Sequence, residues 1–183
     1  MVRTLIWIAA GVILGGIIHL IVILTLPLVA SDTVWDRVTA LDAHHKMQIL
    51  PVPAPGQPNP FGLDPDLTYA ICQVDLGEEP VYLKGSLPDA FWSMAIYNQA
   101  GIVTYSTTNR DGIGQTVDIG IFNAAQTRLL ARQEIDITEG VMVVESTTDH
   151  FFVLLRLAPP QQAMRARFEQ ALGALTCGPQ PTP

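Results

Sequence analysis

The feature that most constrains this chain is an apolar run from Leu5 to Leu26, close to its N-terminus. No Asp, Glu, Lys or Arg occurs between Arg3 and Asp32. A helix rises about 1.5 Å per residue, so roughly 20 apolar residues cross a hydrocarbon core about 30 Å thick. In lipid the backbone must satisfy its own hydrogen bonds, which favours one helix. The run therefore predicts a transmembrane anchor, which we place in residues 1–30.

The flanks of the run predict its orientation. Arg3 precedes it, and acidic residues follow it from Asp32 onward. Because positive charge favours the cytoplasmic side, we expect a cytoplasmic N-terminus and export of the rest of the chain. The alternative is a cleaved signal peptide, whose apolar core is normally about 7–15 residues long and ends in small residues. The longer run and the large side chain of Leu28 favour an uncleaved anchor.

Four residues in the run are candidates for contact with another helix. Gly11, Gly15 and Gly16 follow the small-xxx-small spacing that lets a second helix approach closely. His19 is the one ionisable side chain in the run, and a polar group at membrane depth usually faces protein. Two alternatives stay open: glycine is common in membrane helices in general, and His19 reaches water if it lies near the outer end.

The composition of the rest limits the partners. About 150 residues follow the anchor, which is one domain of ordinary size. The net charge is −7, from 10 basic and 17 acidic residues, and lysine occurs only at Lys46 and Lys84. Binding to nucleic acid or to anionic lipid needs clustered basic residues, so we expect neither. We also expect no cofactor.

The chain has two cysteines, Cys72 and Cys177, and both lie outside the anchor. An even count in an exported domain favours a disulfide, and the alternative is two buried free thiols. Such a bond would close a loop of roughly 100 residues, worth up to about 4–5 kcal/mol in the chain-entropy view. Neither cysteine has another Cys or a His at ligand spacing, so we expect no metal site.

Two segments join the anchor to the main domain. Residues 31–47 place apolar side chains at helical spacing, which predicts a short amphipathic helix just outside the membrane. His44 and His45 would point in different directions on that helix and so would not share a metal. Residues 48–66 contain six prolines and predict a stiff, extended strap, with a disordered tether as the alternative. Phe61 and Leu63 suggest that part of the strap is packed down.

Residues 67–183 show the alternation and turn signals of a β-rich domain. The predicted strands cover residues 67–74, 81–87, 91–97, 102–106, 115–122, 141–145 and 151–157. A short helix is expected over 124–133, and a longer one over 161–175 with Met164, Phe168 and Leu172 on its apolar face. Many short strands followed by a helix predict an antiparallel β-sandwich with a packed C-terminal helix. The fold class is therefore mainly β, behind one transmembrane helix.

Several of these segments resemble an uncharacterised bacterial family, domain of unknown function 1254. The resemblance covers residues 35–177 and is carried by residues 63–65, 69–76, 87–93, 95–97, 151–156 and 174–177, most specifically by 88–97. It implies an envelope protein of the bacterial inner membrane with a β-rich periplasmic domain. It also implies a protein partner, because members often occur beside a companion domain of unknown function. It brings no reaction or catalytic residues, and it supports the pairing of Cys72 with Cys177 without proving it.

No catalytic motif stands out. The chain lacks the nucleophile elbow, the zinc-protease pair and the phosphate-binding loop that sequence patterns reveal. The best candidate ligand site lies at the ends of the hairpin predicted from strands 91–97 and 102–106, and it comprises Asp89, Trp92, Tyr97, Asn98, Asn109, Arg110 and Asp111. Aromatic and amide groups beside a loop suit a sugar or peptide. The alternative is that the aromatic residues are core and the charged ones a solvated turn.

Arg156 is a second notable residue, because it falls within the apolar strand 151–157. A buried guanidinium needs acceptors, and we expect Glu145 of the preceding strand to pair with it structurally, with a ligand clamp as the alternative.

Three functions are compatible with these observations. We expect a non-enzymatic envelope protein that serves a membrane protein complex as a structural, interaction or accessory subunit. The alternative is a binding module for a glycan or another small polar ligand, and the third is an envelope-acting hydrolase.

Overall fold

The structure is a computed structural model that describes residues 2–29, 33–77, 79–111, 114–133 and 141–179. The chain forms two compact units, residues 1–33 and residues 34–183.

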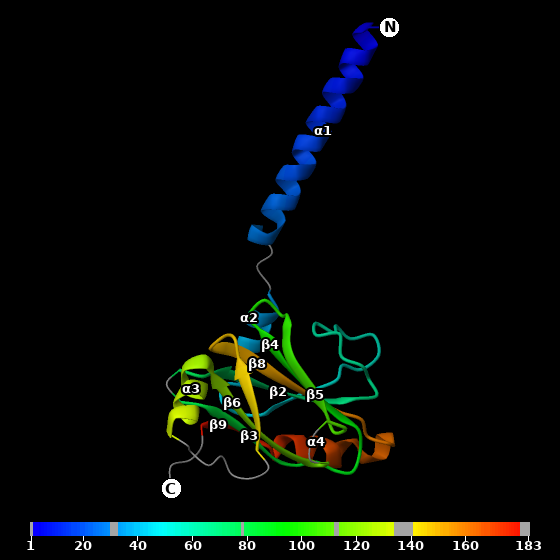
Figure 1. Ribbon diagram of the computed structural model, residues 1–183. Helices are drawn as coiled ribbons and strands as arrows, with labels where there is room; N and C mark the ends of the chain where they lie inside the picture. The colour runs from blue at the N-terminus through cyan, green and yellow to red at the C-terminus, as the bar shows by residue number, and fades with distance from the viewer. Residues whose placement is uncertain (1, 30–32, 78, 112–113, 134–140, 180–183) are drawn as a thin grey trace. The chain divides into compact units, whose positions relative to one another are not determined.

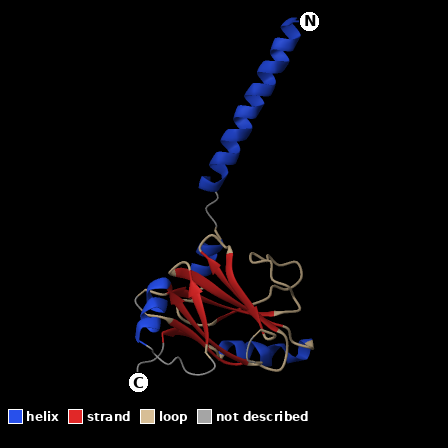
Figure 2. Ribbon diagram, viewed as in Figure 1, coloured by secondary structure: helices blue, strands red, loops and turns tan. Residues whose placement is uncertain are grey.

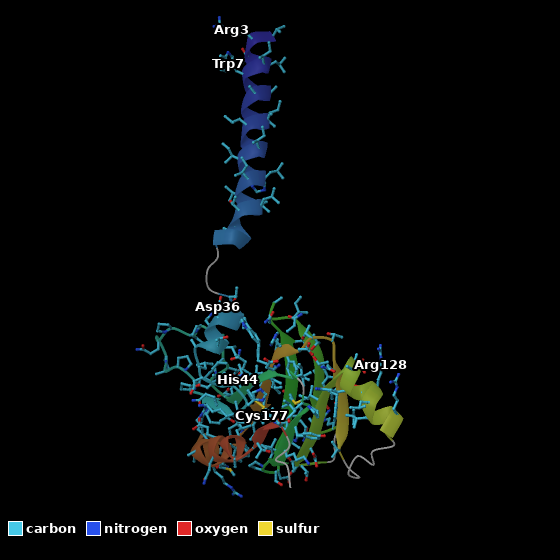
Figure 3. The ribbon with its side chains drawn as sticks, turned by 90° about the vertical axis from the view of Figure 1, so that its left-hand side faces the viewer. Arg3, Trp7, Asp36, His44, Arg128 and Cys177 are labelled. Carbon is cyan, nitrogen blue, oxygen red and sulfur yellow. A yellow bond between two sulfur atoms is a disulfide. The ribbon has the colours of Figure 1, made fainter. Side chains whose placement is uncertain are left out.

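The first unit is the helix α1, Val2–Val29. Its stretch Val2–Leu26 is long and apolar enough to cross a membrane, and none of it is buried within the protein. The side chains around α1, from Trp7 onward, project outward on all sides (Figure 3). A signal sequence near an N-terminus can meet the same test of length and composition, so the predicted helix is confirmed but its retention as an anchor stays a prediction.

The second unit is mainly β and carries short helices (Figures 1 and 2). Its strands are β1 Gln48–Leu50, β2 Thr68–Asp75, β3 Val81–Ser86, β4 Trp92–Asn98, β5 Val103–Thr108, β6 Thr116–Asn123, β7 Met142–Ser146, β8 His150–Leu157 and β9 Thr176–Pro179. Its helices are α2 Val34–Thr39, α3 Ala124–Gln133 and α4 Arg165–Gly173, with a 3₁₀ turn at Gln162–Met164. All seven predicted strands are present, whereas β1 and β9 were not predicted.

The strands form two sheets. One has the order β1-β2-β8-β4-β5, and the other has the order β7-β6-β3-β9. The pairs are antiparallel except β6 with β7, which is parallel. The expectation of a wholly antiparallel domain is therefore wrong at this pair. The reason is α3, which follows β6 and carries the chain back, so that β7 starts at the same end as β6.

The two sheets contribute to one apolar core. Inward residues alternate along the strands, as Leu83 and Val81 do on β3 and Val153 and Leu155 do on β8, and they belong to one buried cluster. Cys72 on β2 and Cys177 on β9 also belong to it and form a disulfide with Cα atoms 6.6 Å apart. The predicted disulfide is confirmed, and it joins one sheet to the other.

The C-terminal helix packs on this core as predicted, but it is shorter than the expected 161–175. Phe168 and Leu172 on α4 are fully buried and contact the same cluster. The chain before Arg165 forms the 3₁₀ turn, and the chain after Ala174 enters β9, where pairing with β3 replaces helical hydrogen bonds.

A second apolar cluster lies beside the five-stranded sheet and includes residues of α2, the strap and the β2 and β8 strands. The helix predicted over 31–47 ends at Thr39, because Asp42 and His45 have φ values of 51° and 50°, which no helix contains. The chain there pairs with β2, since Gln73 N donates to Ala43 O at 2.8 Å. In the strap, Leu63 is buried, which confirms that this segment is packed down.

Candidate functional site

The structure divides the seven residues predicted as a ligand site between the two ends of the β4–β5 hairpin. The register pairs Ser93 with Thr108 and Tyr97 with Val103. Trp92 and Asn109 therefore lie at one end, with Asp89, Arg110 and Asp111, whereas Tyr97 and Asn98 lie at the other. These residues do not form one cluster, and whether either half binds a ligand stays a prediction.

Trp92 belongs to the core, as the alternative interpretation had it. It is 2% exposed, and its indole Nε1 donates to Gly114 O at 3.2 Å. Beside it, Asn109 Nδ2 donates to Ala90 O at 3.3 Å, and Asp111 accepts from the Thr108 hydroxyl at 2.9 Å. Asp89 accepts from Gln115 Nε2 at 3.2 Å. The hydrogen bonds of Asp89, Asn109 and Asp111 therefore stabilise the loops at this end of the hairpin.

At the other end, Asn98 shapes the turn. Its Oδ1 accepts from Ala100 N and from Ile102 N, both at 3.0 Å. The ring of Tyr97 stacks on Phe152 with centroids 5.0 Å apart. Both residues therefore have a structural use.

Arg156 does not pair with Glu145 in the way that the sequence suggested. Its Nη2 donates to the Tyr97 hydroxyl at 3.2 Å. Glu145 is exposed and lies on β7, in the four-stranded sheet, whereas Arg156 lies on β8 in the five-stranded sheet. The predicted pair assumed that β7 and β8, which are consecutive in sequence, are neighbours in one sheet. They belong to different sheets.

The four predicted helix-contact residues Gly11, Gly15, Gly16 and His19 lie on α1. A Cβ added at any of the three glycines would meet nothing within 4 Å. The chain alone thus leaves room for a second helix, and contact with one stays a prediction.

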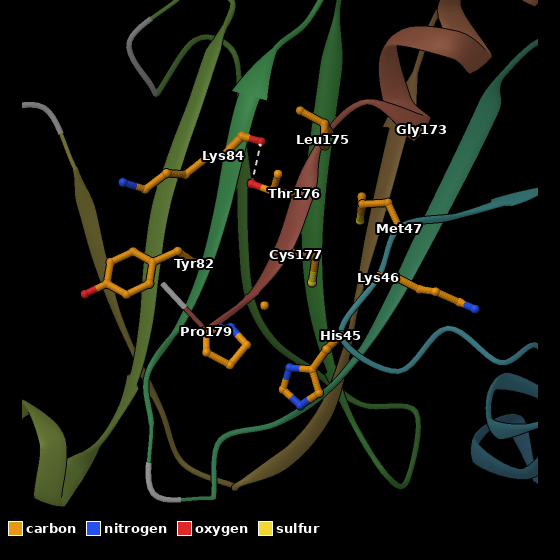
Figure 4. Close-up of a pocket in the computed structure, with 11 residues that line it drawn as sticks. His45, Lys46, Met47, Tyr82, Lys84, Gly173, Leu175, Thr176, Cys177 and Pro179 are labelled. Atoms are coloured by element: carbon orange, nitrogen blue, oxygen red, sulfur yellow. Dashed lines mark hydrogen bonds between the residues drawn. The ribbon is translucent and has the colours of Figure 1, made fainter. Parts of the chain in front are cut away.

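Sequence reasoning missed one cavity in the described part of the chain. It has a volume of 670 Å³ and lies along β9, so we call it the β9 cleft. Its lining consists of residues 45–47, of Tyr82 and Lys84 on β3, and of residues 173 and 175–179. Figure 4 shows Tyr82 and Lys84 on one side of β9 and residues 45–47 on the other.

Long-range pairing assembles the β9 cleft. Residues 44 and 45 are held against β2, where His45 N donates to Gln73 O at 2.9 Å. On the opposite wall, β9 pairs with β3, and the Thr176 hydroxyl donates to Lys84 O at 3.2 Å. The disulfide from Cys177, which lines the cleft, to Cys72 ties β9 to β2. The position of the cleft therefore depends on contacts that no local pattern contains.

Charge distinguishes the β9 cleft from the rest of this acidic chain. Both lysines of the sequence line it, and none of its described lining residues is Asp or Glu. Lys46 pairs with Asp42 at 2.7 Å and Lys84 with Asp118 at 3.6 Å, and both acids stand outside the lining. The lysine side chains are 53% and 36% exposed, so these pairs are weak and an incoming anion can compete for them.

His45 contributes a neutral polar group to the same cleft. Burial lowers the pKa of its imidazole, the neighbouring His44 lowers it further, and Asp75 opposes both. The two imidazole rings meet edge to face with centroids 4.2 Å apart, because this segment is not the helix that was expected to separate them. Among the described residues no group of three or more His, Cys, Asp or Glu is placed to hold a metal ion.

Tyr82 adds an aromatic surface. Its ring packs edge to face on Phe122 at 5.8 Å, and Lys84 Nζ lies 5.2 Å from its centre. Burial raises the pKa of the Tyr82 hydroxyl, and so does the charge of Asp118. The β9 cleft thus offers donors for an anionic group and apolar surface for the rest of a ligand. The sequence signal that pointed here was the restriction of lysine to two positions.

Comparisons with known proteins add little to this description. The chain matches no known protein family and no curated protein. Among solved structures it is similar to the VPA0106 protein from Vibrio parahaemolyticus, with 13% sequence identity and a TM-score of 0.49. The match covers 66% of this chain and 32% of that one, so this chain spans about a third of that protein. A likeness at this level carries no argument, and the resemblance to domain of unknown function 1254 stays a prediction.

Proposed function

We propose that this protein is a non-catalytic, membrane-anchored subunit of an envelope complex, and that it binds an acidic segment of a partner protein in the β9 cleft. The observation that carries the proposal is that both lysines line a 670 Å³ cavity, one on each side of β9 (Figure 4), and that its described lining has no acidic residue. In a chain of net charge −7, a cavity lined by two lysines and by no described acidic residue favours an incoming carboxylate.

The proposed location rests on two further features. The apolar helix α1 has the length to anchor the protein in the inner membrane, with Arg3 on the cytoplasmic side. The Cys72–Cys177 bond suits the oxidising periplasm and not the reducing cytoplasm. We further propose that the two sheets, which share one core, pack face to face as a β-sandwich.

The test is purification of the full chain from its own membranes in mild detergent, with mass spectrometry of proteins that stay bound at equal stoichiometry. The variant is Lys46→Glu with Lys84→Glu. The matched control is Arg128→Glu with Arg132→Glu on α3, which changes the net charge equally at exposed positions. We expect a stable partner that the lysine variant loses and the arginine variant retains. A partner that both variants retain would contradict the role of the cleft.

A second candidate function is the binding of a small anionic molecule in the same cleft. The volume of 670 Å³ falls within the range of about 300–1,000 Å³ that small-molecule sites occupy. This candidate gains if the protein is purified without a partner. An acidic sugar such as glucuronate would then raise the melting temperature of the wild type but not of the lysine variant, and no shift in either would refute it.

A further inference from the structure

The tip of the β4–β5 hairpin carries an unusual group of exposed apolar side chains. The described part of the second unit has six large hydrophobic residues that are exposed: Val34, Phe91, Ile102, Val103, Leu129 and Val143. Ile102 is 61% and Val103 47% exposed, and they are consecutive in the chain. Val34, 39% exposed, stands next to them, because a Cβ built on Gly101 would lie 3.8 Å from its Cγ2 atom. We call Val34, Ile102 and Val103 the tip patch.

Hydrogen bonds within the hairpin turn hold the tip patch in one conformation. Asn98 N donates to Ile102 O at 3.0 Å, Gly101 N donates to Asn98 O at 2.9 Å, and the Asn98 side chain accepts from Ile102 N. Gly101 has a φ of 76°, which glycine adopts without strain. The turn therefore holds the side chains of Ile102 and Val103 exposed to water. Their hydration is unfavourable in free energy, and burial against an apolar partner would remove that cost.

The charge around the tip patch fits a lipid surface. No charged residue occurs from Tyr97 to Asn109, so the whole hairpin is neutral. Acidic side chains flank the hairpin: Asp36 lies on α2, two residues after Val34, and Asp149 lines a hollow of 320 Å³ that also touches Asn98. The Asp149 carboxylate accepts from Asn123 Nδ2 at 3.0 Å. An uncharged tip enters the headgroup region without the cost of burying a charge.

The covalent chain restricts how far the tip patch is from the end of the anchor. Val34 is the first residue of α2, and α1 ends at Val29. Five residue steps span at most about 18 Å even when fully extended. Whichever way the two units turn, Val34 stays within that reach of the end of α1, and Ile102 and Val103 share its neighbourhood.

We infer that the tip patch rests on the membrane from which α1 emerges, with Ile102 and Val103 inserted among the lipid headgroups. This contact would orient the domain on the bilayer as a second attachment beside the anchor. The inference depends on the proposed anchoring by α1.

The experiment uses the full chain in nanodiscs of phosphatidylcholine and phosphatidylglycerol. Both native cysteines are joined in the disulfide, so an introduced cysteine is the one free thiol and accepts a nitroxide label. The test variant is Ile102→Cys, which places the label in the tip patch. Arg167→Cys, on the exposed side of α4, is the control for a label in water, and Ile13→Cys, in α1, is the control for a label in lipid. Unchanged gel mobility without reductant checks that the native disulfide remains.

Collisions with oxygen report lipid, and collisions with a water-soluble nickel chelate report water. We expect the oxygen-to-nickel ratio at position 102 to rise well above that at 167 and to approach that at 13. A ratio at 102 equal to that at 167, with 13 in lipid, would overturn the tip contact and leave the anchoring intact. Shielding of 102 from both reagents would indicate a second protein copy and would also overturn it. An aqueous signal at 13 would refute the anchoring itself, and the tip contact with it.

Discussion

Loss of the Cys72–Cys177 bond provides the most direct test of how this domain is held together. The bond closes a loop of 105 residues and links β2 of one sheet to β9 of the other. In the chain-entropy relation a loop of that length stabilises the folded state by about 4.8 kcal/mol at 25 °C, because the unfolded chain loses freedom. Domains of this size unfold with roughly 5–15 kcal/mol, so the bond would supply a large share of the stability.

The perturbation is the double variant Cys72→Ala with Cys177→Ala. Both sulfur atoms lie in the core, and alanine leaves no unpaired hydroxyl there as serine would. A loss of about 4.8 kcal/mol corresponds to a fall in melting temperature of about 10–19 °C for a domain of roughly 150 residues. The assay is thermal unfolding of the full chain in mild detergent, followed by near-ultraviolet circular dichroism, which reports the packing around Trp92.

A control separates the cross-link from the loss of sulfur packing. Wild-type protein, unfolded and then reduced and alkylated, should refold no better than the double variant. The reasoning is refuted if the variant melts within about 2 °C of the oxidised wild type, well short of the fall that the loop length predicts. That result would mean that pairing of β9 with β3 and packing of α4 suffice to hold the C-terminal segment.

Three further predictions concern single residues. Phe168→Ala should lower the free energy of unfolding by about 3–5 kcal/mol in a chemical denaturation, because it empties a fully buried site under α4; a loss below about 1 kcal/mol would contradict that packing. Trp92→Phe should cost about 1–2 kcal/mol in the same assay, since Gly114 O loses its donor, and an unchanged midpoint would argue against the bond. The lowered pKa of His45 means that the unfolded chain binds its proton more tightly than the folded one does. Stability should therefore be complete above about pH 6.5 and fall as the pH drops through the folded pKa, and the decline should be shallower in His45→Gln; equal pH profiles would refute it.

Local patterns were enough to place most elements. The alternation that ends at Val74 predicted β2, and the helix formers of residues 124–133 predicted α3 with the bounds that the structure has. Asn123 caps that helix, accepting from Gln126 N at 2.9 Å, which is a signal readable from sequence. These elements depend on neighbours within a few residues, so a single sequence contains their causes.

The failures have a common cause in long-range pairing. The helix expected over 31–47 stops at Thr39 because the following chain pairs with β2, far away in sequence. Glu145 was expected beside Arg156 because their strands are consecutive, yet the strands joined different sheets. The seven residues predicted as a ligand site lie at the two ends of the β4–β5 hairpin, as the sequence placed them, and their binding of a ligand stays a prediction.

The sequence by itself determined the apolar helix, the β-rich character of the rest and the helix on which Phe168 lies. The even cysteine count favoured the disulfide, and the tertiary structure decided it by bringing Cys72 and Cys177 together. Only the tertiary structure decided which strands share a sheet and which side chains meet across it. The β9 cleft belongs to that second class, because its lysines are separated in sequence by the strap and by β2. They come to line one cavity, on opposite sides of β9, only when residues 44 and 45 pair with β2 and β9 pairs with β3. The periodicity of apolar residues indicates which face of a helix or strand is buried, but it does not indicate which other element packs against that face.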